Sequence, residues 1–224
     1  MPHNHLFIYC GGAFGREVFD IAERQNKRDR KWAGIWFIDD YAEPASSCYR
    51  TKAFPLDSAI LEFDTTAMEA VIAIGEPVHR ETLHGKLVSH GIRLTQVFDP
   101  SAIVSPTARL GNGVILAPFC SVAANARIGD NVAVNVQAII GHDITINDHT
   151  VISSMVNLGG ACTVGESSYI GMGSQIKDEL KIGSRVIVGM GSVVHHNIDD
   201  DLIALGNPAR VLRRNEDRRV FRKQ

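Results

Sequence analysis

An apolar side chain recurs at every sixth position through the second half of this chain. Val, Leu or Ile occupies all sixteen positions that this spacing selects from Val104 to Val194. A small or aliphatic residue follows four positions after each of them, as at Ala108 and Val114. A period of six fits neither the helical repeat of 3.6 nor a simple alternating strand, but it is typical of a parallel β-helix built from hexapeptides.

The register of this repeat never slips, which predicts a prism without long inserted loops. Three hexapeptides make one triangular turn, and stacked strands lie about 4.8 Å apart. We expect the prism to end near Ile198, before Asp199-Asp200-Asp201 and Gly206-Asn207-Pro208. Residues three hexapeptides apart share a corner of such a prism, so the spacing places distant side chains against one another.

The first part of the chain lacks this period and alternates short apolar runs with helical spacing, the pattern of an α/β domain. We expect strands over Leu6–Tyr9, Ile35–Ile38, Ala70–Ile74 and Leu94–Phe98. We expect helices over Arg16–Arg24 and His79–His90. We therefore divide the chain into a Rossmann-like domain (1–97), a β-helix domain (98–205) and a basic C-terminal tail (206–224). For the tail from Arg210 onward we expect a solvated or frayed helix, with contact to the phosphates of a bound coenzyme as the alternative.

The composition is that of an ordinary globular protein, with 45% apolar residues, 21% charged residues and a formal net charge of −2. This balance argues against non-specific binding to nucleic acid or to an anionic membrane. No apolar run approaches the ~20 residues of a membrane span, and residues 1–5 do not read as a secretory signal, so we expect a cytoplasmic protein. Cys120 and Cys162 fall on inward positions of different prism faces, where a structural role is expected rather than a disulfide or a nucleophile.

Histidines on the predicted prism are the first candidates for chemistry, and there are four: His142, His149, His195 and His196. His142 and His196 share a corner but lie three turns apart, about 14 Å at the spacing of stacked strands. They cannot ligate one metal ion within one chain, and the sequence predicts no metal site.

His142 is followed by Asp143, within the segment Ile140-Gly141-His142-Asp143. A neutral imidazole is a suitable base near pH 7, and a carboxylate on one ring nitrogen directs the other toward a substrate proton. The alternative is a surface histidine beside an unrelated aspartate. One turn later lies Gly160, whose amide would be open to an oxyanion, although a tight corner would favour glycine equally.

A glycine-rich loop, Cys10-Gly11-Gly12-Ala13-Phe14-Gly15, follows the first expected strand and opens a helix. Backbone amides in that setting cradle phosphate. Cys10 stands where the first glycine of the G-x-G-x-x-G fingerprint would be, and Asp39-Asp40 after the second strand could hold ribose hydroxyls. The small size of the domain suggests one mononucleotide-binding half.

Together these motifs resemble the NeuD/PglD family of bacterial sugar acetyltransferases over nearly the whole chain. The segments that carry the resemblance are Gly15-Arg16-Glu17-Val18, Phe37-Ile38-Asp39-Asp40, Ala73-Ile74-Gly75, Gly141-His142-Asp143 and Gly206-Asn207-Pro208-Ala209-Arg210. The resemblance implies that the β-helix is left-handed, that the protein is a homotrimer, and that acetyl-CoA binds between neighbouring prisms.

The resemblance also implies roles for individual residues. His142 matches the base, Asp143 its acidic helper, and Gly160 the amide near the thioester oxygen. Met172 and Met190 match coenzyme contacts, and Val151 stands where some relatives direct a histidine at acetyl-CoA. The nucleotide-sugar site is matched by the following residues: Gly11, Gly12, Ala13, Phe14, Gly15, Asp39, Asp40 and Gly75. Phe14 occupies a position that is histidine in some members.

We therefore expect an enzyme that transfers an acetyl group from acetyl-CoA to an amino or hydroxyl group of a sugar, with a nucleotide-linked acceptor. No cysteine is placed to form an acyl-enzyme, which favours direct attack. The alternatives are a nucleotide-sugar-binding or regulatory protein on the same scaffold, and a zinc hydratase. The sugar, the choice between O- and N-acetylation, and a longer acyl donor stay open.

Overall fold

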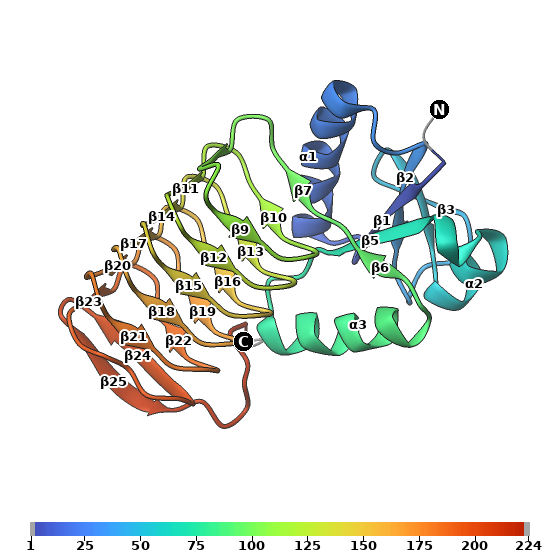
Figure 1. Cartoon of the computed structure of the whole chain (residues 1–224). Helices are drawn as coiled ribbons and strands as arrows, with labels where there is room; N and C mark the ends of the chain where they lie inside the picture. The colour runs from blue at the N-terminus through green and yellow to red at the C-terminus, as the bar shows by residue number, and fades with distance from the viewer. Residues whose placement is uncertain (1–2, 222–224) are drawn as a thin grey trace.

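The computed structural model describes residues 3–221. An α/β domain at the N-terminus is followed by a triangular prism of parallel strands that steps away from it (Figure 1). This is the predicted combination of a Rossmann-like domain and a left-handed β-helix, so the predicted fold class is confirmed.

The N-terminal domain is a six-stranded sheet with helices on both faces. Its elements are β1 (His5–Tyr9), α1 (Ala13–Asp29), β2 (Gly34–Ile38), β3 (Ser46–Cys48), β4 (Thr51–Phe54), α2 (Leu56–Glu62), the 3₁₀ helix η1 (Thr65–Ala67), β5 (Met68–Ile72), α3 (Pro77–Ser89) and β6 (Arg93–Leu94). The strand order is β3-β4-β2-β1-β5-β6, and only β3 and β4 are antiparallel. Leu6 and Ile8 pack under α1, whereas Phe7 and Tyr9 pack under α2 and α3. Because a central parallel strand is buried on both faces, it reads as a continuous apolar run.

The prism has three faces, each a stack of short strands. The first face holds β7 (Val97–Phe98), β10 (Ile115–Leu116), β13 (Ala133–Val134), β16 (Val151–Ile152), β19 (Tyr169–Ile170), β22 (Ile187–Val188), β24 (Leu202–Gly206) and β25 (Ala209–Arg214). The second face holds β8 (Ile103–Val104), β11 (Ser121–Val122), β14 (Ile139–Ile140), β17 (Asn157–Leu158), β20 (Gln175–Ile176) and β23 (Val193–Val194). The third face holds β9 (Arg109–Leu110), β12 (Arg127–Ile128), β15 (Thr145–Ile146), β18 (Thr163–Val164) and β21 (Lys181–Ile182).

The hexapeptide repeat appears in the structure as one strand and one corner per unit. Anchor side chains such as Ile140 and Ile146 point into the prism and are buried. At most corners the third residue after the anchor has a positive φ, as in Asn125 and Asp143. We name the corners by the faces that they join: the 1–2, 2–3 and 3–1 corners.

Two expectations for chain boundaries need correction. The strand expected over Leu94–Phe98 is split, because β6 closes the N-terminal sheet whereas β7 already pairs with β10 of the prism. The expected helix from Arg210 onward is wrong: Ala209–Arg214 forms strand β25, which pairs antiparallel with β24. The last prism turn would otherwise expose an unpaired strand edge, and β25 covers it. Residues 222–224 of the expected tail lie outside the described residues.

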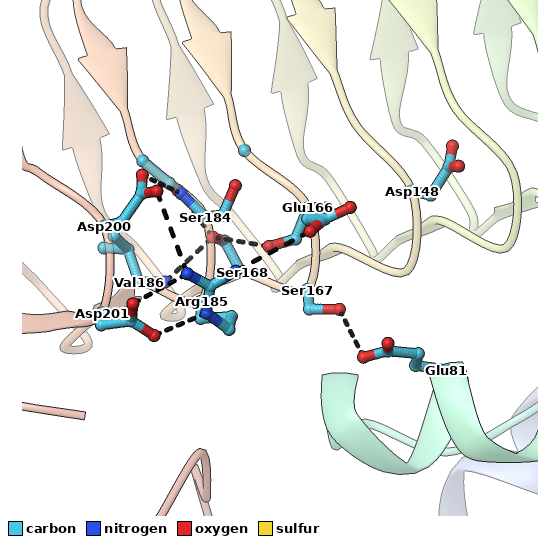
Figure 2. A network of polar contacts seen from close by, with 12 residues as sticks. Glu81, Asp148, Glu166, Ser167, Ser168, Ser184, Arg185, Val186, Asp200 and Asp201 are labelled. Atoms are coloured by element: carbon cyan, nitrogen blue, oxygen red, sulfur yellow. Dashed lines mark hydrogen bonds and ion pairs between the residues drawn. The ribbon is translucent and has the colours of Figure 1, made fainter. Parts of the chain in front are cut away.

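The N-terminal domain packs against the first face and the 3–1 corner. One apolar cluster joins α1 to outward-facing first-face residues, among them Ala133 and Val151. Figure 2 shows a polar link at the 3–1 corner, where the Ser167 hydroxyl donates to Glu81 of α3 at 3.2 Å. None of the helices in residues 3–221 combines the length and apolar character that crossing a membrane requires.

Candidate functional site

His142 and Asp143 lie at the 2–3 corner, between β14 and β15. Asp143 adopts the left-handed conformation of that corner, with φ of 56°, which Asp and Asn adopt more readily than most residues. His142 Nδ1 lies 2.8 Å from Asp143 Oδ2. The two side chains are 68% and 54% exposed, so a ligand can reach them.

Asp143 is held in turn by Asn125, one prism turn below. Asn125 Nδ2 donates to Asp143 Oδ1 at 3.0 Å, and this bond, followed by the one from His142, lowers the pKa of Asp143. An ionised carboxylate only accepts, so His142 Nδ1 is the donor in this bond, and in the neutral imidazole Nε2 then keeps its lone pair. That is the form of a general base. Sequence reasoning missed Asn125, although its spacing from Asp143 places it at the same corner.

Gly160 stacks on His142, as the spacing predicts. A Cβ at this position would lie 2.6 Å from Nε2 of the His142 ring, so the close approach of the imidazole requires glycine. The expectation of an open amide is wrong for this structure, because the Gly160 N–H donates to Asp178 Oδ1 at 2.9 Å. The same kind of contact occurs at another corner, where the Asn112 N–H donates to the Asp130 side chain one prism turn later.

The three residues matched to acetyl-CoA lie elsewhere on the chain. Met172 and Met190 are 48% and 74% exposed at the 1–2 corner, so one chain does not bring them beside His142. Val151 is 1% exposed and packs between the first face and the N-terminal domain. Its burial contradicts a direct contact with the coenzyme, because its side chain points outward from a face that the domain covers.

The glycine-rich loop leads from β1 into α1, as predicted. Cys10 has φ of 82°, and Gly12 caps the helix without a side-chain hydrogen bond to the first amides. A Cβ on Gly15 would lie 2.0 Å from the Cys10 carbonyl oxygen, so only glycine fits there. Ala13 begins the helix, whose free amides face the loop and suit an anionic group.

The two aspartates after β2 have different partners. Asp39 Oδ2 accepts the Gly11 N–H at 3.2 Å and so fixes the loop. Asp40 accepts from the Tyr9 hydroxyl and the Lys86 ammonium, each at 2.7 Å. Hydrogen bonds from Lys86 and Tyr9 offset the effect of burial and lower the pKa of Asp40. The structure thus brings Asp39 to the loop and turns Asp40 toward α3.

Phe14 faces the prism and lines a cavity of about 160 Å³ between α1 and the 1–2 corner. Asn135 lines the same cavity, and its Oδ1 is buried without a hydrogen-bond partner in the described part of the chain. A buried unpaired acceptor is costly unless a ligand or water reaches it. No sequence signal had singled out Asn135.

Gly75, after β5, lies at the carboxyl edge of the N-terminal sheet, the edge that also carries the glycine-rich loop. It lines a cavity of about 620 Å³ together with Glu76, His79, Arg219 and Phe221. Sequence reasoning did not foresee that the C-terminal segment reaches this edge.

Arg80 of α3 is fully buried and joins the two domains. It donates to the carbonyl oxygens of Ile72 and Ile74, and to both the carbonyl and the side-chain oxygen of Asn131 in the prism. Burial lowers the pKa of Arg80 to about 9. Its acceptors are neutral, so the positive charge is not neutralised by a carboxylate in these bonds.

Among residues 3–221 no three His, Cys, Asp or Glu side chains are grouped as a metal site would require. His149 packs against α3, and its ring centroid lies 5.3 Å from that of His84. His195 and His196 are exposed near the end of the second face.

Two family models match the chain. The PglD N-terminal domain matches residues 5–87, and the bacterial transferase hexapeptide (six repeats) matches residues 161–196. A comparison with curated proteins gives no match.

Several solved structures share the whole architecture. Perosamine N-acetyltransferase from Caulobacter crescentus, solved with CoA and GDP-perosamine, is 27% identical with a TM-score of 0.84 over 93% of this chain and 97% of its own. The acetyltransferase domain of PglB from Neisseria gonorrhoeae, solved with acetyl coenzyme A, is 26% identical with a TM-score of 0.84 over 94% and 100%. WeeI from Acinetobacter baumannii is 28% identical with a TM-score of 0.84 over 92% and 99%. Both family models and these structural matches thus identify a PglD-type N-terminal domain followed by hexapeptide repeats, the architecture of the CoA-dependent sugar N-acetyltransferases that the chain resembles.

Proposed function

We propose that this protein transfers the acetyl group of acetyl-CoA to an amino group of a nucleotide-linked sugar. The observation that carries the proposal is the exposed His142–Asp143 pair, with Nδ1 engaged and Nε2 left as an acceptor beside Gly160. The similar structures with bound CoA and GDP-perosamine support the choice of donor and acceptor. Their description as N-acetyltransferases favours an amino acceptor over a hydroxyl.

The reaction follows from this geometry. The acceptor nitrogen attacks the thioester carbonyl carbon while His142 Nε2 takes a proton from it, and Asp143 stabilises the imidazolium that forms. The tetrahedral intermediate then collapses, the C–S bond breaks, and the proton passes from His142 to the CoA sulfur. Direct attack suits the buried positions of Cys120 and Cys162, where burial raises the pKa of both thiols.

The Gly160 amide can stabilise the oxyanion only when Asp178 releases it. Asp178 is exposed, so its carboxylate can turn to solvent as the donor binds. The amide would then point into the space beside Nε2, where the thioester oxygen develops charge.

We infer that the complete site forms between copies of the chain. Met172 and Met190 lie at the 1–2 corner and His142 at the 2–3 corner, so a coenzyme touching both must lie between two prisms. A trimer with three-fold symmetry brings these two corners together three times. The acceptor would reach this groove from the N-terminal domain, its diphosphate on the amides that open α1.

The direct test is release of CoA thiol from acetyl-CoA in the presence of GDP-perosamine or UDP-linked amino sugars. His142→Ala should lower kcat by about 10²–10⁴-fold, the usual contribution of a general base, with CoA affinity retained. His90→Ala, at a half-exposed histidine that ends α3 outside the prism, serves as the control and should keep wild-type turnover. Normal turnover by His142→Ala would refute the assigned role. Binding of nucleotide sugars without any thiol release would instead identify a non-catalytic binding protein.

A further inference from the structure

The segment that follows β25 begins at Asn215, which is held at the far end of the prism by hydrogen bonds. Asn215 is 4% exposed, its N–H donates to the Asp201 carbonyl at 2.8 Å, and its side-chain amide donates to the Arg185 carbonyl at 2.7 Å. Arg185 is itself fixed by Asp201, with Asp200 and Glu166 close by (Figure 2). The C-terminal segment therefore begins from an ordered part of the 3–1 corner.

The same segment is captured again at the N-terminal domain, beside the start of α3 (Figure 1). Glu76 is 5% exposed, and its two carboxylate oxygens accept the N–H groups of Val220 at 2.7 Å and Phe221 at 3.1 Å. The Phe221 ring meets the Tyr169 ring edge-on, with centroids 5.6 Å apart. Residues 216–221, which we name the C-terminal strap, thus bridge two anchors.

The strap forms one wall of the 620 Å³ cavity at the carboxyl edge of the N-terminal sheet. Its size falls within the range of small-molecule sites. Gly75 leaves space for the strap, because a Cβ there would lie 3.3 Å from the Phe221 ring. Phe221 is nevertheless 60% exposed, so most of its ring stays available to a ligand.

The acidic and basic side chains that line this cavity are Glu76, Asp217 and Arg219. Glu76 and Asp217 are each engaged in contacts of their own. Arg219 is exposed, and no ion pair or hydrogen bond of its side chain is found within residues 3–221. Arg80 does not line the cavity, but its buried guanidinium donates to the carbonyl oxygen of Ile74, which does, and to that of Ile72. The Glu76 carboxylate binds the strap backbone, so the Arg219 guanidinium and the Phe221 ring are the two strap groups that can contact an anionic, aromatic ligand.

We propose that the strap is part of the acceptor site: Arg219 binds the diphosphate of the nucleotide sugar, and Phe221 stacks on its nucleobase. This inference rests on the proposed function, which supplies the nucleotide-linked acceptor. It adds a binding wall from the far end of the chain to the glycine-rich loop. A guanidinium matches a phosphate group in charge and geometry, and an aromatic face accepts any base.

Calorimetric titration with GDP, UDP, guanosine, uridine and CoA tests this assignment. Arg219→Ala should raise the Kd of the diphosphates about tenfold, as expected for ~1.4 kcal/mol of lost charged contact, and leave the nucleosides unchanged. Phe221→Ala should weaken nucleosides and diphosphates alike. Arg213→Ala removes an exposed arginine of β25 away from the cavity and should bind as wild type.

The possible outcomes distinguish failure of the strap proposal from failure of the proposed function. Wild-type affinity for the diphosphates in both strap variants would overturn the strap proposal and leave acetyl transfer intact. Loss of CoA affinity in Arg219→Ala, with diphosphate affinity kept, would assign the strap to the coenzyme and also overturn it. If wild-type protein bound neither diphosphate, the acceptor class in the proposed function would fail together with the strap.

Discussion

The chemistry of His142 depends on three residues at the same corner of the prism. Asp143 binds Nδ1, Asn125 holds Asp143 from below, and Gly160 leaves room for the ring above. The exposed bond between imidazole and carboxylate adds little stability. Its value lies in orientation, because misplacement of a reacting group by about 1 Å can cost 10²-fold in rate.

Gly160→Ala tests this positioning. The new Cβ would fall 2.6 Å from Nε2, so the His142 ring must rotate away from its place beside Asp143. We expect kcat to fall by about 10²-fold while the thermal midpoint changes little, because Gly160 has no positive φ. Gly85→Ala on α3 is the matched control, since a Cβ there meets nothing within 4 Å. Equal activity of the two variants would show that the ring position is unimportant.

At the scale of elements, hydrogen bonds join α3 to the prism. The same hydrogen-bond network determines which protonation state His149 can have. Asn131 places its side-chain oxygen against Arg80 and its amide nitrogen against the Arg80 carbonyl, which fixes the direction of the amide. The same nitrogen lies 3.1 Å from His149 Nδ1, so Nδ1 must accept. Burial, and then His84, lower the pKa of His149, whereas Asp148 and Glu81 act in the opposite direction.

The domain interface should therefore weaken in acid. The unfolded chain takes up a proton near pH 6.5, whereas the folded protein does so only at lower pH, so stability falls as pH decreases through this window. His149→Gln keeps an acceptor toward Asn131 but does not titrate. Thermal unfolding is measured at pH 7.5 and at pH 5.5, both in ~0.1 M salt. The decrease in Tm between the two pH values should be smaller in the variant than in wild type. His90→Gln, at a half-exposed histidine that ends α3, is the control and should lose as much Tm as wild type.

At the scale of the whole molecule, two sets of exposed groups lie on different edges of one rigid prism. His142 lies at the 2–3 corner, whereas the exposed Met172 and Met190 lie at the 1–2 corner. A stiff prism cannot fold one edge onto the other, so a coenzyme that touches both sets requires a second copy.

Co-assembly of two inactive variants tests this arrangement. His142→Ala removes the base, and Met190→Asp places a charge where the coenzyme would pack. In a mixed trimer the Met190→Asp chain can supply wild-type His142 and the His142→Ala chain can supply wild-type Met190 to one shared site. On random mixing of equal amounts, roughly a quarter of the sites receive both wild-type residues, so roughly a quarter of wild-type activity should return. Light scattering should show a mass three times that of the chain. No recovery in mixed trimers would place both residues in sites of single chains, and a monomeric mass would exclude the shared site.

The hexapeptide period by itself determined the prism, its turns and the stacking of Gly160 on His142, because a fixed rise and three corners per turn convert residue spacing into position. It also placed the adjacent residues His142 and Asp143 together at a corner of the prism, whereas the bond between them is seen only in the structure. The apolar runs of the first domain located β1, β2 and β5, since burial on two faces leaves a clear signal in sequence.

Only the tertiary structure decided how the side chains are satisfied and where the ends of the chain lie. The Gly160 amide donates to Asp178, Val151 is covered by the N-terminal domain, and the tail forms β25 and then reaches Glu76. Each of these depends on contacts between segments far apart in sequence, which no local period encodes. The hexapeptide repeat specifies where each residue lies along the axis of the prism. Which other segments of the chain pack against the prism depends on the surfaces of those segments, which lie far away in the sequence.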